Sequence, residues 1–187
     1  MPIETDQETE MEDMNETYGE VTFLGNPLTL LGETPKQGDV APDFCVLDGE
    51  LNETNLSNFS GKVRVILAVP SLDTPVCDME VRKFNETASL LSGDVKVLAV
   101  SMDLPFAQAR WCGAAGVDNV IALSDHRDAS LGAAYGVLIK ELRLLCRAVF
   151  VVDRSGSLTY VQIVKEIADE PDYEAALAAV KEAVAKE

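Results

Sequence analysis

The sequence lacks the features that would place it in a membrane or outside the cell. No apolar run approaches the roughly 18 residues that a transmembrane helix needs. The first twenty residues have neither the basic patch nor the apolar core of a secretion signal. These absences predict a cytoplasmic protein without a membrane partner.

Positive charge is also scarce. The formal net charge is −17, and residues 1–20 contain eight acidic side chains but no lysine or arginine. Binding to nucleic acid needs a positive surface, so this composition argues against a nucleic-acid partner. Self-repulsion and few apolar groups leave residues 1–20 little to pack with, which predicts a disordered acidic tail. That tail is either simply solubilising or a partner-binding arm.

Histidines are almost absent, and cysteine pairs are missing. The chain has one histidine, His126, and no C-x-x-C pair. Its four cysteines are Cys45, Cys77, Cys112 and Cys146. This set lacks zinc-ligand spacing and is too sparse for a secreted disulfide scaffold. Because no motif connects His126 to a nucleophile, a Ser-His-Asp or Cys-His hydrolase is disfavoured. The cysteines are therefore structural thiols or redox groups.

Strand and helix patterns, by contrast, alternate along most of the chain. Apolar strand patterns occupy residues 63–69, 94–103 and 119–125, and helical patterns occupy residues 77–91, 105–116, 130–137 and 172–187. Hairpins are predicted at residues 21–31, around a Gly-Asn-Pro turn, and at 147–164. This order predicts one α/β domain over residues 21–187, with a mixed central sheet flanked by helices. It resembles the thioredoxin-like fold with an added N-terminal β-hairpin.

The segment PSLDTPVCDMEVRKF, residues 70–84, follows the apolar run at 63–69 and leads into a helical pattern. Cys77 is then expected in the first helical turn, where unpaired N–H groups and the helix dipole favour an anion such as a thiolate. Thr74 can direct its hydroxyl toward the sulfur or toward a bound oxygen. A buried, inert thiol at the same position is the alternative, and the helix start alone does not decide between them.

The combination P-x-x-x-T-x-x-C in this segment resembles the active-site signature of the peroxiredoxins. The stretches VRKFN, DLPFAQARWCG, LCRAVFVVD and EPDYEAALAAVK follow in order. Together they resemble the thiol peroxidase type of atypical two-cysteine peroxiredoxin, over about residues 21–187. The resemblance implies an enzyme that reduces hydrogen peroxide and organic hydroperoxides.

The resemblance also implies a role for each site residue. Cys77 would be the peroxidatic cysteine, which attacks the peroxide and becomes a sulfenic acid. Thr74 and Arg147 would donate hydrogen bonds to the thiolate and the peroxide, and Pro70 would shield the sulfur. Cys112 would be the resolving cysteine, forming an intrachain disulfide with Cys77 after local unwinding of both helices.

Partners are implied in the same way. Thioredoxin or a similar dithiol would reduce the disulfide, and the chain would form a homodimer. Leu104, Phe106 and Trp111 would then form either a dimer contact or part of the core. No metal, haem, flavin or selenium is implied, because sulfur carries the redox change. Two other functions stay open: a redox-sensing interaction protein that uses the same cysteine pair, and a structural module with inert cysteines.

The residues by themselves also allow roles away from catalysis. Cys112 fits a packed thiol at a helix end, and Arg147 fits a salt bridge to a carboxylate. Arg127 either supports the site from a distance or lies in a solvated loop. Cys45 is expected in the core, and Cys146 is expected to face away from Arg147 if its segment is extended.

Overall fold

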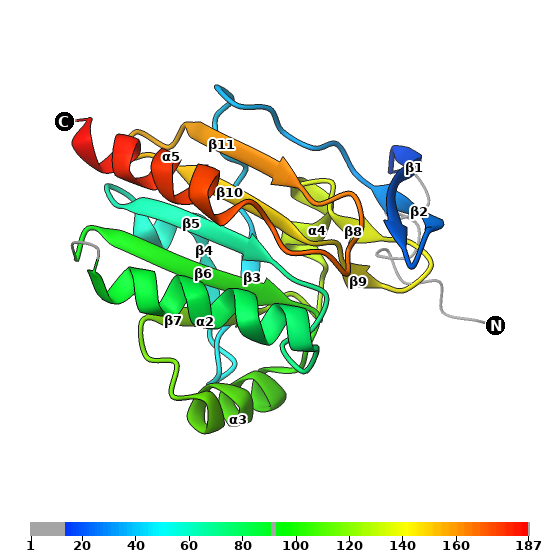
Figure 1. Cartoon of the computed structure of the whole chain (residues 1–187), viewed down its shortest axis with the longest axis horizontal. Helices are drawn as coiled ribbons and strands as arrows, with labels where there is room; N and C mark the ends of the chain where they lie inside the picture. Colours follow the sequence, from blue (N-terminus) through cyan, green and yellow to red (C-terminus); the bar gives the residue numbers. More distant parts are fainter. Residues whose placement is uncertain (1–13, 91–92, 187) are drawn as a thin grey trace.

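The computed structural model describes residues 14–90 and 93–186 and is built around a seven-stranded sheet (Figure 1). Its strands are β3 (Cys45–Leu47), β4 (Glu53–Asn55), β5 (Val63–Ala68), β6 (Val95–Ser101), β7 (Val120–Ser124), β10 (Ala148–Val152) and β11 (Leu158–Ile163). The order across the sheet is β11-β10-β5-β6-β7-β3-β4. Because β5, β6 and β7 run parallel while the outer pairs are antiparallel, the sheet is mixed, as predicted.

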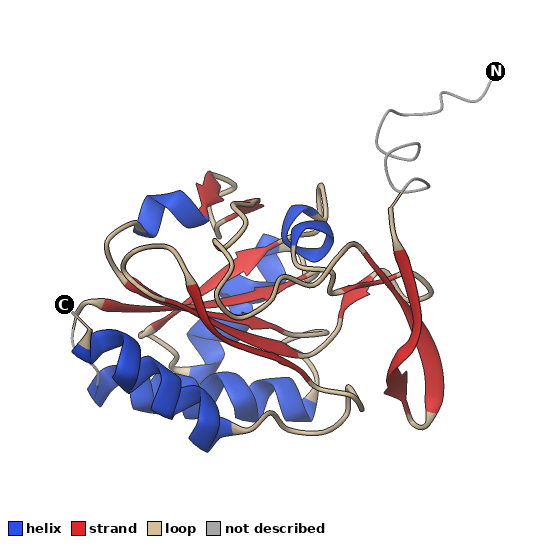
Figure 2. Cartoon of the chain, turned by 90° about the horizontal axis from the view of Figure 1, so that it is seen from above, coloured by secondary structure: helices blue, strands red, loops and turns tan. Residues whose placement is uncertain are grey.

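Helices pack on this sheet and leave its central strands buried on both faces. They are η1 (Leu56–Phe59), α2 (Pro75–Leu90), α3 (Pro105–Ala115), α4 (Ser130–Ala134) and α5 (Tyr173–Ala185). The long helices α2 and α5 cover one face, as Figures 1 and 2 show. Along β5, Val65 and Leu67 pack with these helices, while Ile66 and Ala68 pack into the core on the other face. Burial on both faces explains the continuous apolar run of β5.

The long predicted elements are confirmed. The predicted strands correspond to β5, β6 and β7, the predicted C-terminal hairpin to β10 and β11, and the predicted helices to α2, α3, α4 and α5. Helix α3 begins at Pro105 and ends at Ala115, and it is capped by Gly116, which has a left-handed φ of 65°. Among the helices of the described ranges, none has both the length and the apolar character that crossing a membrane requires. The cytoplasmic location stays a prediction.

A second, smaller sheet contains the N-terminal hairpin. Its strands, in order, are β1 (Glu16–Phe23), β2 (Asn26–Leu31), β8 (Leu138–Ile139) and β9 (Leu144–Leu145). The hairpin is confirmed, but its turn lies at Leu24 and Gly25, with φ of 50° and 79°, instead of at Gly-Asn-Pro. Left-handed φ at both central residues suits a two-residue hairpin turn. Asn26 and Pro27 consequently belong to β2.

The predicted boundary of the acidic tail at residue 20 needs correction. Strand β1 already begins at Glu16, where Glu16 pairs with Leu31 in the register of β2. Its carboxylate also forms an ion pair with Lys140. The backbone pairing with β2 and the ion pair with Lys140 hold the end of the acidic segment in place. Neither interaction can be read from the composition of the segment. Residues 1–13 of the predicted tail lie outside the described residues.

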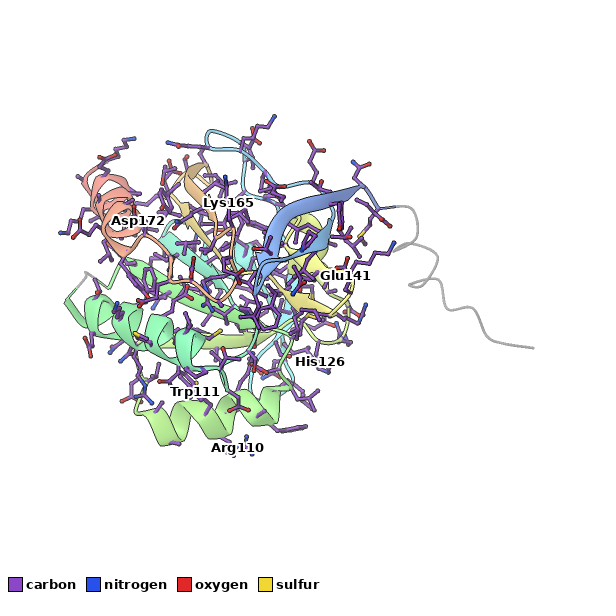
Figure 3. The ribbon with its side chains drawn as sticks, turned by 45° about the vertical axis from the view of Figure 1, so that its right-hand side comes forward. Arg110, Trp111, His126, Glu141, Lys165 and Asp172 are labelled. Atoms are coloured by element: carbon purple, nitrogen blue, oxygen red, sulfur yellow. The ribbon has the colours of Figure 1, made fainter. Side chains whose placement is uncertain are left out.

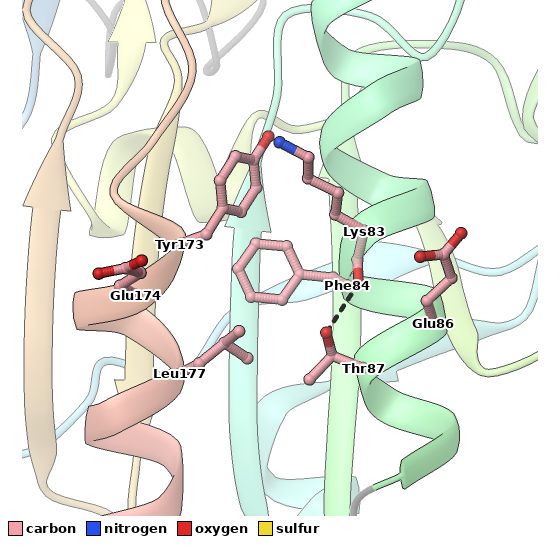
Figure 4. A pocket seen from close by; sticks show the side chains of 7 residues that line it. All are labelled: Lys83, Phe84, Glu86, Thr87, Tyr173, Glu174 and Leu177. Atoms are coloured by element: carbon pink, nitrogen blue, oxygen red, sulfur yellow. Dashed lines mark hydrogen bonds between the residues drawn. The ribbon is translucent and has the colours of Figure 1, made fainter.

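Helices α2 and α5 contact each other around a surface pocket of about 320 Å³ (Figure 4). Within it, the ring centroids of Phe84 and Tyr173 are 5.8 Å apart. The Lys83 ammonium lies 4.1 Å from the centre of the Tyr173 ring and forms an ion pair with Glu170 at 2.7 Å. These contacts fix the C-terminal helix against the helix that carries Cys77.

Gly136, between α4 and β8, is packed so tightly that we expect Gly136→Ala to destabilise the fold. A Cβ there would lie 2.5 Å from the backbone nitrogen of Thr34, at a φ of +62°. Gly156 has a φ of +95° but no atom within 4 Å of the equivalent position, so Gly156→Ala is a matched control. Urea denaturation should show Gly136→Ala less stable than the control by about 2 kcal/mol. Equal losses would contradict the proposed crowding.

Candidate active site

Cys77 is the third residue of α2, which begins at the end of the loop that follows β5. Pro75 is the first helical residue, and the N–H of Asp78 donates to the carbonyl of Thr74 at 2.9 Å. Proline suits this position because its missing N–H would be unpaired there in any case. The Cys77 side chain is fully buried, at 0% exposure. The chain therefore holds this sulfur inside the protein, at the positive end of a helix.

Two hydrogen-bond donors reach the sulfur of Cys77. The Thr74 Oγ1 atom lies 2.7 Å from Cys77 Sγ, and Arg147 Nη2 lies 3.4 Å from it. Thr74 Oγ1 is also 2.9 Å from the carbonyl oxygen of Ser71. A thiolate only accepts, so in that state the Thr74 hydroxyl donates to sulfur. In the thiol state the S–H can donate to Oγ1 while the hydroxyl donates to Ser71. The contacts accommodate both protonation states.

Arg147 directly precedes β10, the strand that pairs with β5. Its side chain is 2% exposed, and its Nε and Nη2 atoms donate to the carbonyl oxygen of Ile167 at 3.2 and 3.1 Å. Its Nη1 atom donates to Glu80 in a buried ion pair. Arg147 therefore contacts both of the partners that the sequence suggested for it, the Cys77 sulfur and a carboxylate. The guanidinium is held from several sides with one edge toward Cys77.

Glu80 is a component of the site that the sequence did not reveal. It is fully buried and lies three residues after Cys77, on the same face of α2. Burial raises the pKa of this carboxyl to about 7, although the neighbouring Arg147 opposes the shift. Its Oε1 atom has no hydrogen-bond partner among the described residues. The only hint of it in the sequence is the position of Glu80, one helical turn beyond Cys77.

The raised pKa of Glu80 predicts a pH-dependent loss of stability. The pKa of this carboxyl is about 7 in the folded protein and near 4.5 in the unfolded chain. Its contribution to stability is therefore fully present below pH 4.5 and is lost as the pH rises through 7. Glu80→Gln removes this titration. The free energy of unfolding of the wild type, minus that of Glu80→Gln, should therefore fall by about 3 kcal/mol between pH 4.5 and 8. Glu174→Gln, at an exposed position, is the control, and a constant difference for Glu80→Gln would contradict this account.

Asp103, two residues beyond the end of β6, anchors the loop between β5 and α2. Its carboxylate accepts hydrogen bonds from Ser71 Oγ at 2.7 Å, the Leu72 N–H at 2.8 Å and Ser101 Oγ at 2.7 Å. Because β5 and β6 are parallel, their carboxyl ends meet at one edge of the sheet, which brings Asp103 to this loop. The sequence did not reveal this contact. It fixes the segment that presents Thr74 to the sulfur.

An apolar pocket of about 310 Å³ adjoins the buried sulfur. It is lined by Phe23, Pro70, Thr74, Pro75, Val76, Leu142, Leu144, Arg147, Ile167 and Ala168. Pro70 is itself buried and lines this pocket together with Thr74 and Arg147, the two donors to Cys77. The structure thus brings together Cys77, Thr74, Arg147 and Pro70, and places an apolar pocket next to this cluster.

Cys112 is not bonded to Cys77. It lies on α3, is half-buried, and all four cysteines are free thiols. Burial raises the pKa of the Cys112 thiol, and the negative charge of Asp118 adds to the shift. The two helices are nevertheless in contact, because Trp111 donates from its indole Nε1 to Asp78 at 3.0 Å. Cys112 is thus a protonated thiol on a neighbouring helix.

The other two cysteines and Arg127 lie outside this cluster. Cys45 is half-buried at the start of β3 and not in the core as predicted, because it pairs with Asn55 of the short edge strand β4, whereas β3 pairs with β7 only at Leu47. Cys146 is fully buried in the core on the opposite face from α2, and burial raises its pKa to about 12. Arg127 is 44% exposed and pairs with Glu53 and Asp128, as expected for a solvated loop.

The remaining candidates give no second site. His126 Nδ1 lies 2.9 Å from Ser124 Oγ, but that hydroxyl donates to the carbonyl of Asp103 and is buried, which does not suit a hydrolase nucleophile. Leu104 and Phe106 are 54% and 65% exposed, which excludes them from the core of this chain. Within residues 14–90 and 93–186, no group of three histidine, cysteine or acidic side chains is placed to hold a metal ion.

Comparison with known proteins agrees with this geometry. A family model described as Redoxin matches residues 36–177. A thiol peroxidase of Bacillus subtilis (strain 168) is 55% identical over 162 residues, which cover 87% of this chain and 96% of the relative. A thiol peroxidase of Staphylococcus aureus (strain COL) is 56% identical over 162 residues, covering 87% and 98%.

Solved structures have the same fold. A peroxiredoxin-like protein from Aquifex aeolicus superposes with a TM-score of 0.82 at 44% identity, covering 90% of this chain and 99% of that one. A thiol peroxidase from Chromobacterium violaceum gives a TM-score of 0.79 at 21% identity, covering 92% and 100%. The second match shows the thioredoxin-like fold alone. With the family match and the curated relatives, the chain belongs to the Redoxin family and, within it, to the thiol peroxidases.

Proposed function

We propose that Cys77 reduces peroxides at the site formed with Thr74, Arg147 and Pro70. The Cys77 thiolate attacks one peroxide oxygen, the S–O bond forms, and the O–O bond breaks. The departing oxygen takes a proton and leaves as water or as an alcohol, and Cys77 becomes a sulfenic acid. The observation that carries this proposal is the pair of donors on the buried sulfur, at 2.7 and 3.4 Å.

The two donors fit the movement of charge in this step. Negative charge passes from sulfur to the leaving oxygen, so donors aimed at this region stabilise the transition state. Arg147 supplies a fixed cation. The Thr74 hydroxyl can donate its hydrogen bond either to the Cys77 sulfur or to a peroxide oxygen. Glu80 and the Ile167 carbonyl restrain the guanidinium, so little reorganisation is needed during the reaction.

We further propose that Cys112 resolves the sulfenic acid. The Cys112 sulfur attacks Cys77, the S–S bond forms, and the hydroxyl leaves as water with the proton of the thiol. Because the two thiols lie on different helices, this step requires local unwinding around them. A dithiol such as thioredoxin then attacks the intrachain disulfide and restores both thiols, itself becoming oxidised.

The apolar pocket supports organic hydroperoxides as substrates alongside hydrogen peroxide. Its lining is almost wholly apolar, and it leads to Thr74 and Arg147. A hydrocarbon group placed there would be removed from water while its peroxide group reaches Cys77. Hydrogen peroxide has no such group and gains nothing from the pocket walls.

Leu142→Ser should therefore discriminate between the two kinds of substrate. Leu142 lines the pocket and is 40% exposed, so a serine there removes apolar contact without opening the core. We expect the KM for cumene hydroperoxide to rise about threefold to tenfold, because part of the 1.5–3 kcal/mol of a buried leucine is lost. The KM for hydrogen peroxide should stay constant. Leu51→Ser, at an exposed position that does not line the pocket, is the control; equal rises for both peroxides would exclude this role of the pocket.

The homodimer and the cytoplasmic location remain part of this proposal. The exposed Leu104 and Phe106, at the start of the helix that carries Cys112, offer an apolar surface for a second copy. Burial of these side chains in a dimer interface would remove them from water. A monomeric mass for the full chain in sedimentation experiments would contradict the dimer.

A coupled assay tests the function as a whole. The wild type is mixed with peroxide, thioredoxin, thioredoxin reductase and NADPH, and NADPH oxidation is followed at 340 nm. Oxidation that requires all components supports a thioredoxin-dependent peroxidase. If peroxide generates the disulfide but no sustained turnover follows with this or another dithiol, the redox-sensing alternative replaces the enzymatic one.

A further inference from the structure

The residues next to the two cysteines contact each other, although the two sulfurs are not bonded. Asp78 follows Cys77 on α2, and Trp111 precedes Cys112 on α3. The indole Nε1 atom of Trp111 donates to Asp78 Oδ1 at 3.0 Å. In Figure 3, Trp111 lies between α2 and α3, whereas Arg110 lies on the outer side of α3. This hydrogen bond joins the segments that must rearrange to form a disulfide.

Arg82 reinforces the same contact. Its Nε atom donates to Asp78 Oδ2 at 2.8 Å, and its guanidinium carbon lies 5.8 Å from the centre of the Trp111 ring. Its Nη1 atom donates to the carbonyl oxygen of Ala115, near the end of α3, at 2.8 Å. We call Asp78, Arg82 and Trp111 the helix clasp. Its members connect the first two turns of α2 to the second half of α3.

The position of the clasp conflicts with a disulfide between the helices. Successive residues of an α-helix point about 100° apart, so Cys77 faces the core while Asp78 faces α3. A disulfide needs the two Cα atoms within about 7 Å and the sulfurs about 2 Å apart. To turn the buried Cys77 sulfur toward Cys112, the first turn of α2 must unwind or rotate. Asp78 belongs to that turn, so it would leave Trp111.

We propose that the helix clasp holds α2 and α3 in the dithiol arrangement, so that its opening controls how fast the Cys77 sulfenic acid condenses with Cys112. Trp111 and Arg82 are thereby positioning residues, which act through the two helices and not on the peroxide. The inference rests on the proposed roles of Cys77 and Cys112. It adds the contact that has to break between the two chemical steps.

A looser clasp has opposite effects on two competing reactions. The sulfenic acid either condenses with the Cys112 thiol, releasing water, or meets a second peroxide and becomes a sulfinic acid. If the clasp delays the first reaction, weakening it favours the disulfide and protects Cys77 from over-oxidation. It also shifts the equilibrium toward the disulfide, because only the dithiol form loses a contact.

Trp111→Phe is the direct variant, because it removes the N–H donor, together with part of the indole ring, and keeps an aromatic ring beneath Arg82. Arg82→Met is a second variant, which removes the contacts to Asp78 and Ala115 while keeping an unbranched side chain. Asn85→Ala is the matched control. Asn85 Oδ1 accepts a 2.8 Å hydrogen bond from the N–H of Asn119, so it also ties α2 to the chain beyond α3, but further along α2 from Cys77.

The experiment follows the full-length reduced protein after rapid mixing with one equivalent of hydrogen peroxide. Acid quenching, alkylation and mass spectrometry separate the loss of the Cys77 thiol from the appearance of the Cys77–Cys112 disulfide. We expect Trp111→Phe and Arg82→Met to keep the rate of thiol loss and to form the disulfide about fivefold faster, the effect of roughly 1 kcal/mol for one hydrogen bond. In redox buffers the reduction potential should become about 20 mV more negative.

The outcomes separate the clasp from a general loosening of the fold and from failure of the proposed function. Faster disulfide formation in both clasp variants, with an unchanged rate in Asn85→Ala, supports the clasp. Unchanged or slower formation in Trp111→Phe overturns it, and so does equal acceleration in Asn85→Ala. If wild-type Cys77 does not react with peroxide at all, the proposed function itself is wrong, which is visible before any variant is compared.

Discussion

Replacing Cys77 with serine should reduce peroxide consumption to the rate of a protein-free control. The nucleophile required is a thiolate, and a serine hydroxyl is not ionised near neutral pH. Thr74 and Arg147 would still offer their donors, but no group at the site could accept an oxygen from the peroxide and form a sulfenic acid. Peroxide disappearance, measured with an excess of reductant, gives the answer directly.

The other cysteines supply the controls. Cys45→Ser should retain full activity, because Cys45 lies half-buried on β3 and none of the site contacts described above involves it. Cys112→Ser should consume about one equivalent of peroxide and then stop with thioredoxin as reductant, because no resolving thiol remains. Sustained peroxide consumption by Cys77→Ser would show that a residue other than Cys77 reacts with the peroxide.

Replacing Arg147 with methionine should lower kcat/KM for hydrogen peroxide by about 10²- to 10³-fold, the range typical of losing one preorganised donor at developing charge. Methionine fills much of the same volume but donates no hydrogen bond. The loss should appear in the rate of Cys77 oxidation measured by stopped flow. The later disulfide step should change far less, because Arg147 contacts the sulfur of Cys77 and not α3.

The Arg147 variant needs a partner substitution, because it leaves Glu80 buried without its cation. A broken buried ion pair commonly costs 3–5 kcal/mol of stability, so Arg147→Met could lose activity merely by unfolding. Arg147→Met combined with Glu80→Gln removes the unpaired charge and should restore stability without restoring the rate. Recovery of the rate in this double variant would show that Arg147 acts through the fold and not on the reaction.

The parts of the site that are local in sequence could be predicted. An uninterrupted apolar segment becomes β5, buried on both faces, and the proline-containing loop after it leads into α2. Thr74 and Cys77 are three residues apart, so the helix start alone brings hydroxyl and sulfur together. Arg147 is distant in sequence, and only the family resemblance selected it from the arginines of the chain.

The parts that depend on packing could not be predicted. Glu80 is one of many acidic residues, and only its burial beside Arg147 distinguishes it. Asp103 reaches the loop before α2 because β5 and β6 are parallel neighbours, a relation that no local pattern specifies. Strands of two or three residues, such as β8 and β9, are too short for a periodic signal.

The most direct test of the account is a mass-spectrometric map of the disulfides after the reduced wild type has reacted with one equivalent of peroxide. We expect one new disulfide, between Cys77 and Cys112 of the same chain, with Cys45 and Cys146 still free thiols. A disulfide that involves Cys45 or Cys146, one that joins two chains, or a Cys77 that remains a thiol after the peroxide is consumed would contradict it.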